Sequence, residues 1–373
     1  MYPPLPLISA IGTPRKCGIT YGSVAAHAIA ANTANYLGRF AAVGIDVEQA
    51  RGYGALFRDA AHRHAPRVAE MLDGVAEGAR VDVDEIYALN GRTELMYSAN
   101  PGAEPSECTA IAVLGQRTAS GHTLLAQNWD WHPDQRPYAL LLDTTDELGR
   151  RVLALTEAGM LAKAGLNDAG LGVCVNMLGS EHDRRDGGVP YHVLLRAALD
   201  APHLGAALRA VCAVPRGASI NLLMGQAFAG DTPGEAIDVE VAPGDVGFVH
   251  PSDGVITHAN HFESALSAVD TLKYIGSSSF FRSARARRLL GDGLIDEDRI
   301  KAVLRDHGGF PQSICRHDEP DAAAADRTES LFALVLDLDE RRMSIAHGPT
   351  CAGAEYRHIR MDESDRIGHR AGV

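Results

Sequence analysis

Cys108 stands at the start of an apolar stretch, in a position where it could act as a nucleophile. Residues 106–110 read Ser-Glu-Cys-Thr-Ala and lead directly into the apolar run 111–114. If the bond between Glu107 and Cys108 were cut, Cys108 would carry both a thiol and a free α-amine. An α-amine titrates near pH 8 and a thiol near about 8.5. Because these values are close, the amine could take the thiol proton at neutral pH.

The chain from Cys108 to Trp131 has the pattern of a β-hairpin. Two mainly apolar stretches flank a polar segment that contains a Ser-Gly step, which is typical of two strands joined by a turn. With the turn centred near Ala119, antiparallel pairing places Cys108 opposite residue 129 or 130. We therefore expect Asp130 to lie across from the candidate nucleophile.

Side chains alternate between the two faces of a strand, so Asn128 and Asp130 share one face and Trp129 shares the other with Trp131. The register determines which of these two faces Cys108 shares, and a shift of one residue would move it to the other. Polar groups on one face and large aromatics on the other suit the wall of a site, although an ordinary half-buried hairpin has the same pattern. Asn128 and Trp129 are candidate substrate-binding residues.

Six short motifs resemble, in order and spacing, those of the isopenicillin N acyltransferase family. This family comprises the acyl-coenzyme A:6-aminopenicillanic acid acyltransferases with their carcinine and β-alanyl-dopamine hydrolase relatives, within the N-terminal nucleophile hydrolases. The resemblance runs from about Gly38 to Tyr356 and covers most of the chain. The motifs are Glu107-Cys108-Thr109, Gln127-Asn128-Trp129-Asp130-Trp131, Thr156-Glu157-Ala158-Gly159, Gly165-Leu166-Asn167 with Gly170-Leu171-Gly172, His258-Ala259-Asn260-His261 and Ser313-Ile314-Cys315-Arg316-His317.

The resemblance implies roles for four residues of this chain. Cys108 would be the nucleophile, and Asp130 would orient the α-amine or a nearby donor. Asn260 would supply an oxyanion-hole donor, and Arg316 would hold the surroundings of the nucleophile. His261, beside Asn260, is a third candidate for substrate binding.

The resemblance also implies an inactive precursor that cleaves itself before the cysteine and remains a two-fragment enzyme, with fragments 1–107 and 108–373 held together. The Cys108 thiolate would attack the Glu107 carbonyl, an N-to-S acyl shift would give a thioester, and water would release the new amine. The same thiol would then take the acyl group of a small N-acyl compound and pass it to water or an amine. Family members often have Gly before the cysteine, and the bulky acidic Glu107 could slow or redirect self-cleavage.

Composition describes an ordinary globular protein. The chain has 373 residues, 46% hydrophobic and 22% charged, without a linker-like segment, so we expect one domain. A formal net charge of −13 argues against nucleic acid as a partner. The chain opens without a signal-like segment and has no run of 18 apolar residues, so we expect a soluble, cytoplasmic protein that does not bind membranes. The expected partners are a small-molecule substrate, the cleaved fragment and, in a homo-oligomer, a second copy.

We expect no cofactor, although a coenzyme A thioester could serve as the acyl donor. The basic run from Arg282 to Arg288 is predicted to be the solvated face of a helix, and it is also the first candidate for binding the phosphates of coenzyme A. The six cysteines are dispersed without a C-x-x-C spacing, and we expect them to be reduced and mostly buried. They are Cys17, Cys108, Cys174, Cys212, Cys315 and Cys351.

Hydrophobic periodicity predicts an α+β fold in which two antiparallel sheets pack face to face with helices outside, a four-layer αββα sandwich. The resemblance implies the same N-terminal nucleophile hydrolase fold. The N-terminal third is predicted to be mainly helical, with helices over 46–77 and 83–97, and later helices over 190–213, 277–291 and 296–306. The predicted strands are 108–115, 122–131, 138–144, 151–157, 160–166, 171–178, 218–227, 236–241, 246–249, 330–338 and 342–346.

Three alternatives remain open from the residues themselves. His258 and His261, with His132 and Asp130, could bind zinc in a metal-dependent amidohydrolase. Cys315, beside a cationic neighbour and a histidine, could be the nucleophile of an enzyme that never cleaves itself. The chain could also be a non-processing relative that binds an acyl compound without acting on it. Glu157 is interpreted as a surface charge outside the catalytic set.

Overall fold

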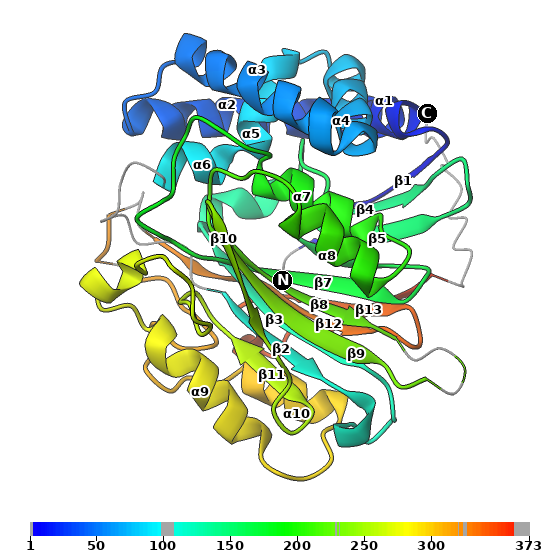
Figure 1. The fold of residues 1–373 in the computed structure, drawn as a ribbon, viewed down its shortest axis with the longest axis vertical. Coiled ribbons are helices and arrows are strands. Elements are labelled where there is room, and N and C mark those ends of the chain that lie inside the picture. The colour runs from blue at the N-terminus through cyan, green and yellow to red at the C-terminus, as the bar shows by residue number, and fades with distance from the viewer. Residues whose placement is uncertain are drawn as a thin grey trace.

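Two β-sheets pack face to face in the computed structural model, and helices cover the outer side of each (Figure 1). The structure describes residues 3–97, 108–227, 230, 232–319, 321–323 and 327–361. The predicted αββα architecture is therefore confirmed. Within the described residues, no helix is both long and apolar enough to cross a bilayer.

The larger sheet has eight strands in the order β1-β4-β5-β6-β7-β8-β9-β10. All of its neighbouring strands are antiparallel except the first pair, because β1 runs parallel to β4. The N-terminal segment thus contributes an edge strand to a sheet whose other strands come from residues after Cys108. The strands are β1 (Leu7–Ile11), β4 (Ala139–Thr145), β5 (Arg151–Glu157), β6 (Ala164–Asn167), β7 (Leu171–Met177), β8 (Ile220–Gln226), β9 (Glu235–Ala242) and β10 (Asp245–Val249).

The smaller sheet has six antiparallel strands in the order β11-β2-β3-β12-β13-β14. Two of them, β11 and β14, each four residues long, lie in segments where no strand was predicted. The strands are β2 (Thr109–Val113), β3 (Leu124–Trp131), β11 (Val255–His258), β12 (Glu329–Asp337), β13 (Arg342–His347) and β14 (Arg357–Arg360).

Six helices precede Cys108 in the part of the chain that the structure describes (Figure 1). The prediction of a mainly helical N-terminal third is therefore confirmed. The start of α3 has a recognisable cap: the Asp46 side chain accepts a hydrogen bond from the backbone N–H of Gln49, and the Gln49 side chain accepts one from the backbone N–H of Asp46. The helices are α1 (Pro14–Val24), α2 (Ala26–Ala42), α3 (Val47–His64), α4 (Pro66–Ala79), α5 (Val83–Asn90) and α6 (Arg92–Tyr97).

Two short helices, α7 (Tyr191–Leu199) and α8 (Leu204–Cys212), cover the eight-stranded sheet. One continuous helix over 190–213 was predicted, and that prediction is wrong at its centre. Residues 200–203 interrupt it, and they include Pro202, which cannot donate a helical hydrogen bond.

The six-stranded sheet is covered on its outer side by α9 (Ser279–Leu290) and α10 (Glu297–Leu304). Apolar residues of strands β2, β3 and β12 alternate between this layer and the space between the sheets. Ile111 and Val113 pack toward the helices, whereas Ala110 and Ala112 pack into the larger core between the sheets. This alternation defines an inner face, toward the other sheet, and an outer face, toward α9 and α10.

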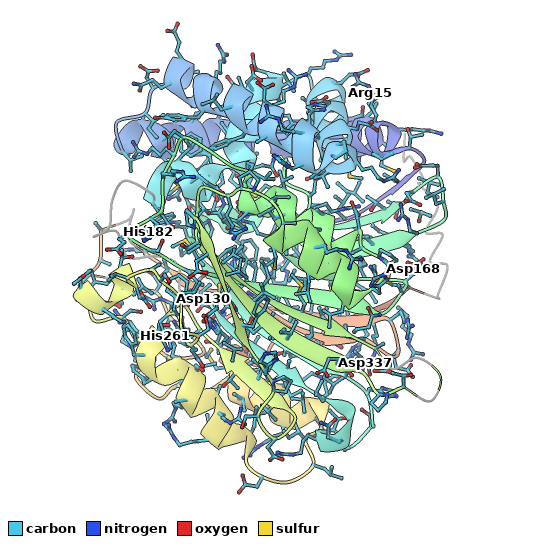
Figure 2. All side chains as sticks on the ribbon, viewed as in Figure 1. Arg15, Asp130, Asp168, His182, His261 and Asp337 are labelled. Atoms are coloured by element: carbon cyan, nitrogen blue, oxygen red, sulfur yellow. The ribbon has the colours of Figure 1, made fainter. Side chains whose placement is uncertain are left out.

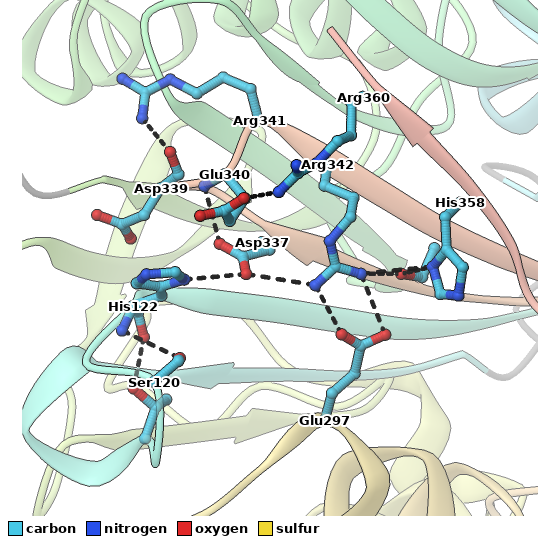
Figure 3. A network of polar contacts seen from close by, with 12 residues as sticks. Ser120, His122, Glu297, Asp337, Asp339, Glu340, Arg341, Arg342, His358 and Arg360 are labelled. Carbon is cyan, nitrogen blue, oxygen red and sulfur yellow. Dashed lines mark hydrogen bonds and ion pairs between the residues drawn. The ribbon is translucent and has the colours of Figure 1, made fainter. Parts of the chain in front are cut away.

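A network of polar contacts ties α10 to the far end of the six-stranded sheet (Figure 3). Arg342 on β13 forms an ion pair of 2.8 Å with Glu297 on α10 and contacts Asp337 on β12 at 3.3 Å. The Asp337 carboxylate also lies 3.0 Å from the His122 ring. Arg342 and Lys301 outweigh the effect of burial and hold the pKa of Glu297 at about 2, so this attachment persists across the physiological pH range.

Candidate active site

Cys108 is the residue immediately before β2, and the register of the hairpin determines which side its thiol faces. Thr109 pairs with Asn128 and Ala110 with Gln127. Extended by one step, this register places Cys108 opposite Trp129, which was one of the two predicted partners. The expectation that Asp130 lies directly across from Cys108 is wrong, because the centre of the hairpin falls half a residue before Ala119.

That half-residue shift places Cys108 and Trp129 on the inner face and Asn128 and Asp130 on the outer face. Gln127, which has the parity of Trp129, donates from its side-chain amide to the backbone carbonyl of Val175 in the facing sheet. The Trp129 ring stacks on Phe332, with centroids 5.7 Å apart. The aromatic side chains therefore line the same side as Cys108, not the opposite side.

The Cys108 thiol is buried, with 4% of the residue exposed. Its Sγ lies 3.9 Å from the backbone carbonyl oxygen of Asp130. Burial, with the negative charge of Asp130, raises the pKa of Cys108 to about 12, and Arg282 and Lys163 only partly oppose this. The thiol is therefore protonated at neutral pH, and a base would have to remove its proton before Cys108 could act as a nucleophile.

On the outer face, the Asp130 carboxylate is linked to Arg316 through Ser330. Ser330 Oγ donates to Asp130 Oδ1 at 2.6 Å and accepts from the Arg316 backbone N–H at 3.0 Å. The Arg316 guanidinium donates from Nε to Thr328 Oγ1 at 2.7 Å. The structure thus brings together two residues that the motifs place far apart in the sequence.

Asn128 also belongs to the outer face. Its Nδ2 donates to the backbone carbonyls of Leu304, at 2.8 Å, and Ile314, at 2.7 Å. These contacts attach the strand to the end of α10 and to the segment that carries Arg316. Asn128 points away from the thiol, which does not favour its predicted role in substrate binding.

Arg282, on α9, connects Cys108 to Asn260. Its Nη1 donates to the Cys108 backbone carbonyl at 2.7 Å and to Thr109 Oγ1 at 2.8 Å, while its Nη2 donates to Asn260 Oδ1 at 3.0 Å. The Asn260 amide in turn donates from Nδ2 to the Met177 carbonyl at 2.9 Å. Two of the predicted catalytic residues are therefore held by one buried guanidinium.

Sequence reasoning missed Arg282, which was assigned to a solvated basic face and is fully buried. Helical spacing contained the signal: Arg282, Ala286 and Leu290 recur every four residues and are all buried on one side of α9. The next arginine of the run, Arg285, pairs with Asp306 at 2.5 Å. Two arginines of the run, Arg282 and Arg285, therefore bind groups of the protein itself, whereas Arg288 is exposed.

A second buried cluster, centred on Glu157, lies beside the inner face. Glu157 is fully buried, which contradicts its interpretation as a surface charge. Its carboxylate accepts from Tyr36 at 2.7 Å, Arg92 at 3.2 Å and Lys163 at 2.9 Å. Burial alone would raise the pKa of Glu157, but Lys163 and Arg92 outweigh burial and lower it. The carboxylate is therefore ionised at neutral pH.

Lys163 is the member of this cluster whose charge influences Cys108. Its Nζ lies 2.6 Å from His192 Nε2 and 5.7 Å from the centroid of the Trp129 ring. Burial and the charge of Arg92 lower the pKa of Lys163 to about 7, and the charge states of Lys163 and Cys108 influence each other. Lys163 can thus exchange a proton near neutral pH. No motif identified it, because its burial depends on packing between distant segments.

The histidines considered as zinc ligands make other contacts. His258 Nε2 lies 2.7 Å from Glu240, and His261 Nδ1 lies 2.8 Å from Ser279 Oγ. His132 Nδ1 lies 3.0 Å from the Arg327 carbonyl. Within the described residues these three do not form a group of metal-binding side chains, so the structure does not favour the zinc amidohydrolase.

Figure 2 shows Asp130 and His261 at the same end of the sheets and Asp337 at the other end. Asn260, Arg282 and the hairpin end at Asp130 thus gather around Cys108. Burial lowers the pKa of His261 to about 4, so its imidazole is neutral near pH 7. Glu107, the predicted cleavage partner of Cys108, lies outside the described residues.

The chain is similar to known proteins. The family model described as acyl-coenzyme A:6-aminopenicillanic acid acyl-transferase matches residues 117–350, a range that includes Asp130, Asn260 and Arg316. The chain is 28% identical over 354 residues to the 40 kDa form of acyl-coenzyme A:6-aminopenicillanic-acid-acyltransferase from Emericella nidulans, covering 91% of this chain and 92% of that protein.

Solved structures also match, with low identity. A mutant of the conjugated bile acid hydrolase from Clostridium perfringens has a TM-score of 0.42 and 12% identity, covering 69% of this chain and 94% of that one. Penicillin V acylase from Agrobacterium tumefaciens has a TM-score of 0.43 and 14% identity, covering 69% of this chain and 87% of that one.

Proposed function

The chain belongs to the acyl-coenzyme A:6-aminopenicillanic acid acyl-transferase family, and on that premise we propose that it activates itself by cutting the bond between Glu107 and Cys108. Cys108 then serves as the nucleophile that takes and transfers an acyl group. One observation carries this proposal: Arg282 binds the Cys108 carbonyl and the Asn260 side chain together in a buried position. Such an arrangement fixes a nucleophile and an amide donor relative to each other before any substrate arrives.

The first cut must proceed without the α-amine, because the nitrogen of Cys108 is still part of the peptide bond. We assign the base of this step to Lys163, whose pKa of about 7 leaves a substantial neutral fraction at neutral pH. Lys163 takes the thiol proton, and the thiolate attacks the carbonyl carbon of Glu107. The proton then passes to the leaving nitrogen, so that a thioester joins Glu107 to Sγ. Water hydrolyses this thioester and leaves a carboxylate on Glu107 and a free thiol and amine on Cys108.

During turnover the new α-amine replaces Lys163 as the base, because it is attached to the nucleophile itself and titrates near about 8. The thiolate attacks the acyl carbon of the substrate, and the Asn260 amide stabilises the oxyanion that develops. The leaving group departs with a proton, and the acyl group remains on Sγ as a thioester. Water or an amine then accepts it and restores the thiol.

The substrate class that fits this chemistry is a small N-acyl compound or an acyl thioester such as that of coenzyme A. The curated relative is named for transfer from acyl-coenzyme A to 6-aminopenicillanic acid, which makes a coenzyme A thioester a reasonable first donor to test. Whether water or an amine resolves the acyl-enzyme depends on how well the pocket excludes water.

The two fragments should remain associated after the cut, because buried contacts join them. Strand β1 is part of the eight-stranded sheet, and Tyr36 and Arg92 supply partners of the buried Glu157. Asn32 Nδ2 also donates to the Ala158 carbonyl at 2.8 Å. Neither fragment could bury these groups alone.

The test is the intact mass of the purified protein under denaturing conditions, beside a Cys108→Ala variant. We expect two fragments meeting at the Glu107–Cys108 bond in the parent, one full-length species in Cys108→Ala, and hydrolysis of acyl donors by the parent only. Cys174→Ala is the matched control, since Cys174 is a buried thiol of the facing strand β7 and its variant should still be cut.

A parent that stays whole yet turns over acyl donors would contradict the α-amine mechanism. A parent that stays whole and binds an acyl compound without turnover would favour the non-processing alternative, for which Glu107 in place of the usual Gly is the specific reason.

A further inference from the structure

Two histidines and two cysteines converge outside the candidate active site. His307 follows α10, Cys315 and His317 lie in the next segment, and Cys351 lies in the 3₁₀ turn Thr350–Ala352 after β13. One donor atom from each residue, a ring nitrogen or a sulfur, lies within 4.8 Å of those of the other three. Residues separated by up to 44 positions in the sequence thus place four metal-binding groups at one point.

Three distances within this cluster, all to His317 Nε2, are close to those of a tetrahedral metal site. His307 Nε2 and His317 Nε2 are 3.1 Å apart, Cys351 Sγ and His317 Nε2 are 3.3 Å apart, and Cys315 Sγ and His317 Nε2 are 3.8 Å apart. Zinc bonds of about 2.0 to 2.1 Å to nitrogen and about 2.3 Å to sulfur, at tetrahedral angles, require about 3.3 Å between two nitrogens and about 3.6 Å between nitrogen and sulfur. The observed separations differ from these values by only a few tenths of an ångström.

We propose that His307 Nε2, Cys315 Sγ, His317 Nε2 and Cys351 Sγ bind one Zn²⁺ ion. Two imidazole nitrogens and two thiolates are a donor set that zinc prefers. On binding, the two thiols release their protons, so the two thiolates neutralise the two positive charges of the ion. All four positions are then filled by protein, which makes the site structural and leaves no position for a substrate or water.

The backbone around the cluster is already ordered by hydrogen bonds. The Cys315 N–H donates to the Asp306 carbonyl at 2.9 Å, and the His317 N–H donates to the Pro311 carbonyl at 3.0 Å. The Phe310 ring lies 5.2 Å from the His317 ring, centroid to centroid. The ligands are therefore held in position by contacts that do not involve the ion.

The ion would tie three separate parts of the chain together behind the six-stranded sheet: the end of α10, the segment of Cys315 and the C-terminal 3₁₀ turn. Arg316 lies between two of the ligands, and its backbone N–H bonds Ser330, which bonds Asp130. Zinc would thus fix the segment that reaches the outer face of β3. This inference does not depend on the proposed catalytic role of Cys108.

The test begins with the full chain, purified without an affinity tag, in reductant and without chelators. Inductively coupled plasma mass spectrometry should find about one zinc per chain. Cys351→Ser and Cys315→Ser should lose at least about nine tenths of it. Cys212→Ser, which changes a partly exposed cysteine at the end of α8, should retain the full equivalent. Replacing zinc with Co²⁺ in the parent should produce the visible bands of tetrahedral cobalt and a sulfur-to-cobalt charge-transfer band.

If the cysteine variants do not fold, the parent alone decides the question. It should remove one equivalent of Zn²⁺ from a coloured chelator and melt at a higher temperature with zinc than after chelation. Three results would each overturn the proposal: a reduced parent that is purified without zinc and takes up none of the added ion, a disulfide between Cys315 and Cys351 in freshly purified protein, or a full equivalent of zinc retained by Cys351→Ser.

Discussion

The two faces of the six-stranded sheet carry different kinds of polar chemistry. On the inner face, the charge of Lys163 influences Cys108; the pKa of Lys163 lies near 7, and its Nζ pairs with a buried carboxylate. On the outer face, Asn128 binds backbone carbonyls and Asp130 binds the Ser330 hydroxyl. Groups that can exchange protons thus lie on the side of the sheet that the thiol faces, whereas groups that hold the backbone lie on the opposite side. A substitution on one face should therefore change rate, and a substitution on the other should change stability.

Replacing Lys163 should have the largest effect among substitutions of residues other than the nucleophile. Lys163→Met removes the proposed base of the first cut, and general base catalysis typically contributes about 10²- to 10⁴-fold. Lys163→Arg should be as slow, because it keeps a positive charge beside Glu157 but stays protonated. The measurement is the rate of fragment formation by denaturing electrophoresis. In the parent, this rate should rise with pH through about 7, as Lys163 loses its proton. Rapid cutting by Lys163→Arg would rule out this base.

Replacing Asn260 should slow the acyl transfer step itself. Loss of one oxyanion donor costs about 10²- to 10³-fold in kcat, or about 2.7 to 4 kcal/mol. We expect Asn260→Ala to lose this much in kcat with little change in KM, measured on whichever acyl donor the parent accepts. An unchanged kcat would assign the oxyanion to other donors and leave Asn260 as a partner of Arg282 only.

Asn128→Ala tests the outer face. It leaves the carbonyls of Leu304 and Ile314 without their donor, and each unsatisfied buried group costs about 1 to 3 kcal/mol. The free energy of unfolding, from urea denaturation, should fall by about 2 to 6 kcal/mol. Asn167→Ala is the matched control, because Asn167 also donates to two backbone carbonyls at 2.8 Å, in the other sheet. A large loss of kcat in Asn128→Ala, without loss of stability, would contradict the inference that outer-face residues affect stability and inner-face residues affect rate.

His258 gives the smallest expected effect, and it appears only as a pH dependence. Asp238 and Glu240 outweigh burial and raise the pKa of His258 to about 9. A folded-state pKa above the unfolded value of about 6.5 stabilises the protein fully below about pH 6.5, and this stabilisation is lost as pH rises through about 9, by at most about 3 kcal/mol. His258→Asn should flatten the fall in melting temperature between about pH 7 and 9.5. An equal fall in parent and variant would assign the effect to other groups.

Strand and helix periodicity predicted most elements and the layered fold, because alternation and helical spacing are local properties. The side of the sheet that each hairpin residue occupies could not be predicted as reliably. A half-residue error in the turn centre moved Trp129 onto the face of Cys108 and Asp130 off it. Side chains alternate strictly between the two faces of a strand. A register error of one residue therefore moves every side chain of the strand to the wrong face.

The burial of Glu157 and Lys163 could not be predicted from the sequence, for a different reason. Glu157 and Lys163 look like surface residues locally, and only partners from α2 and α6, here Tyr36 and Arg92, explain their burial. The converging cysteines and histidines are a similar case. Cys315 and His317 could be singled out as a reactive pair, but Cys351 comes from a turn beyond two further strands.

The pairing of the N-terminal strand β1 with β4 affects whether the molecule can refold after it unfolds. An uncut chain that unfolds can return by itself, because all of its strands belong to one molecule. If the bond before Cys108 is cut as proposed, the edge strand and the six helices after it belong to a separate chain, and refolding requires an encounter whose rate depends on concentration. The mature form would then be protected mainly by slow unfolding, and dilution after denaturation would make its loss permanent.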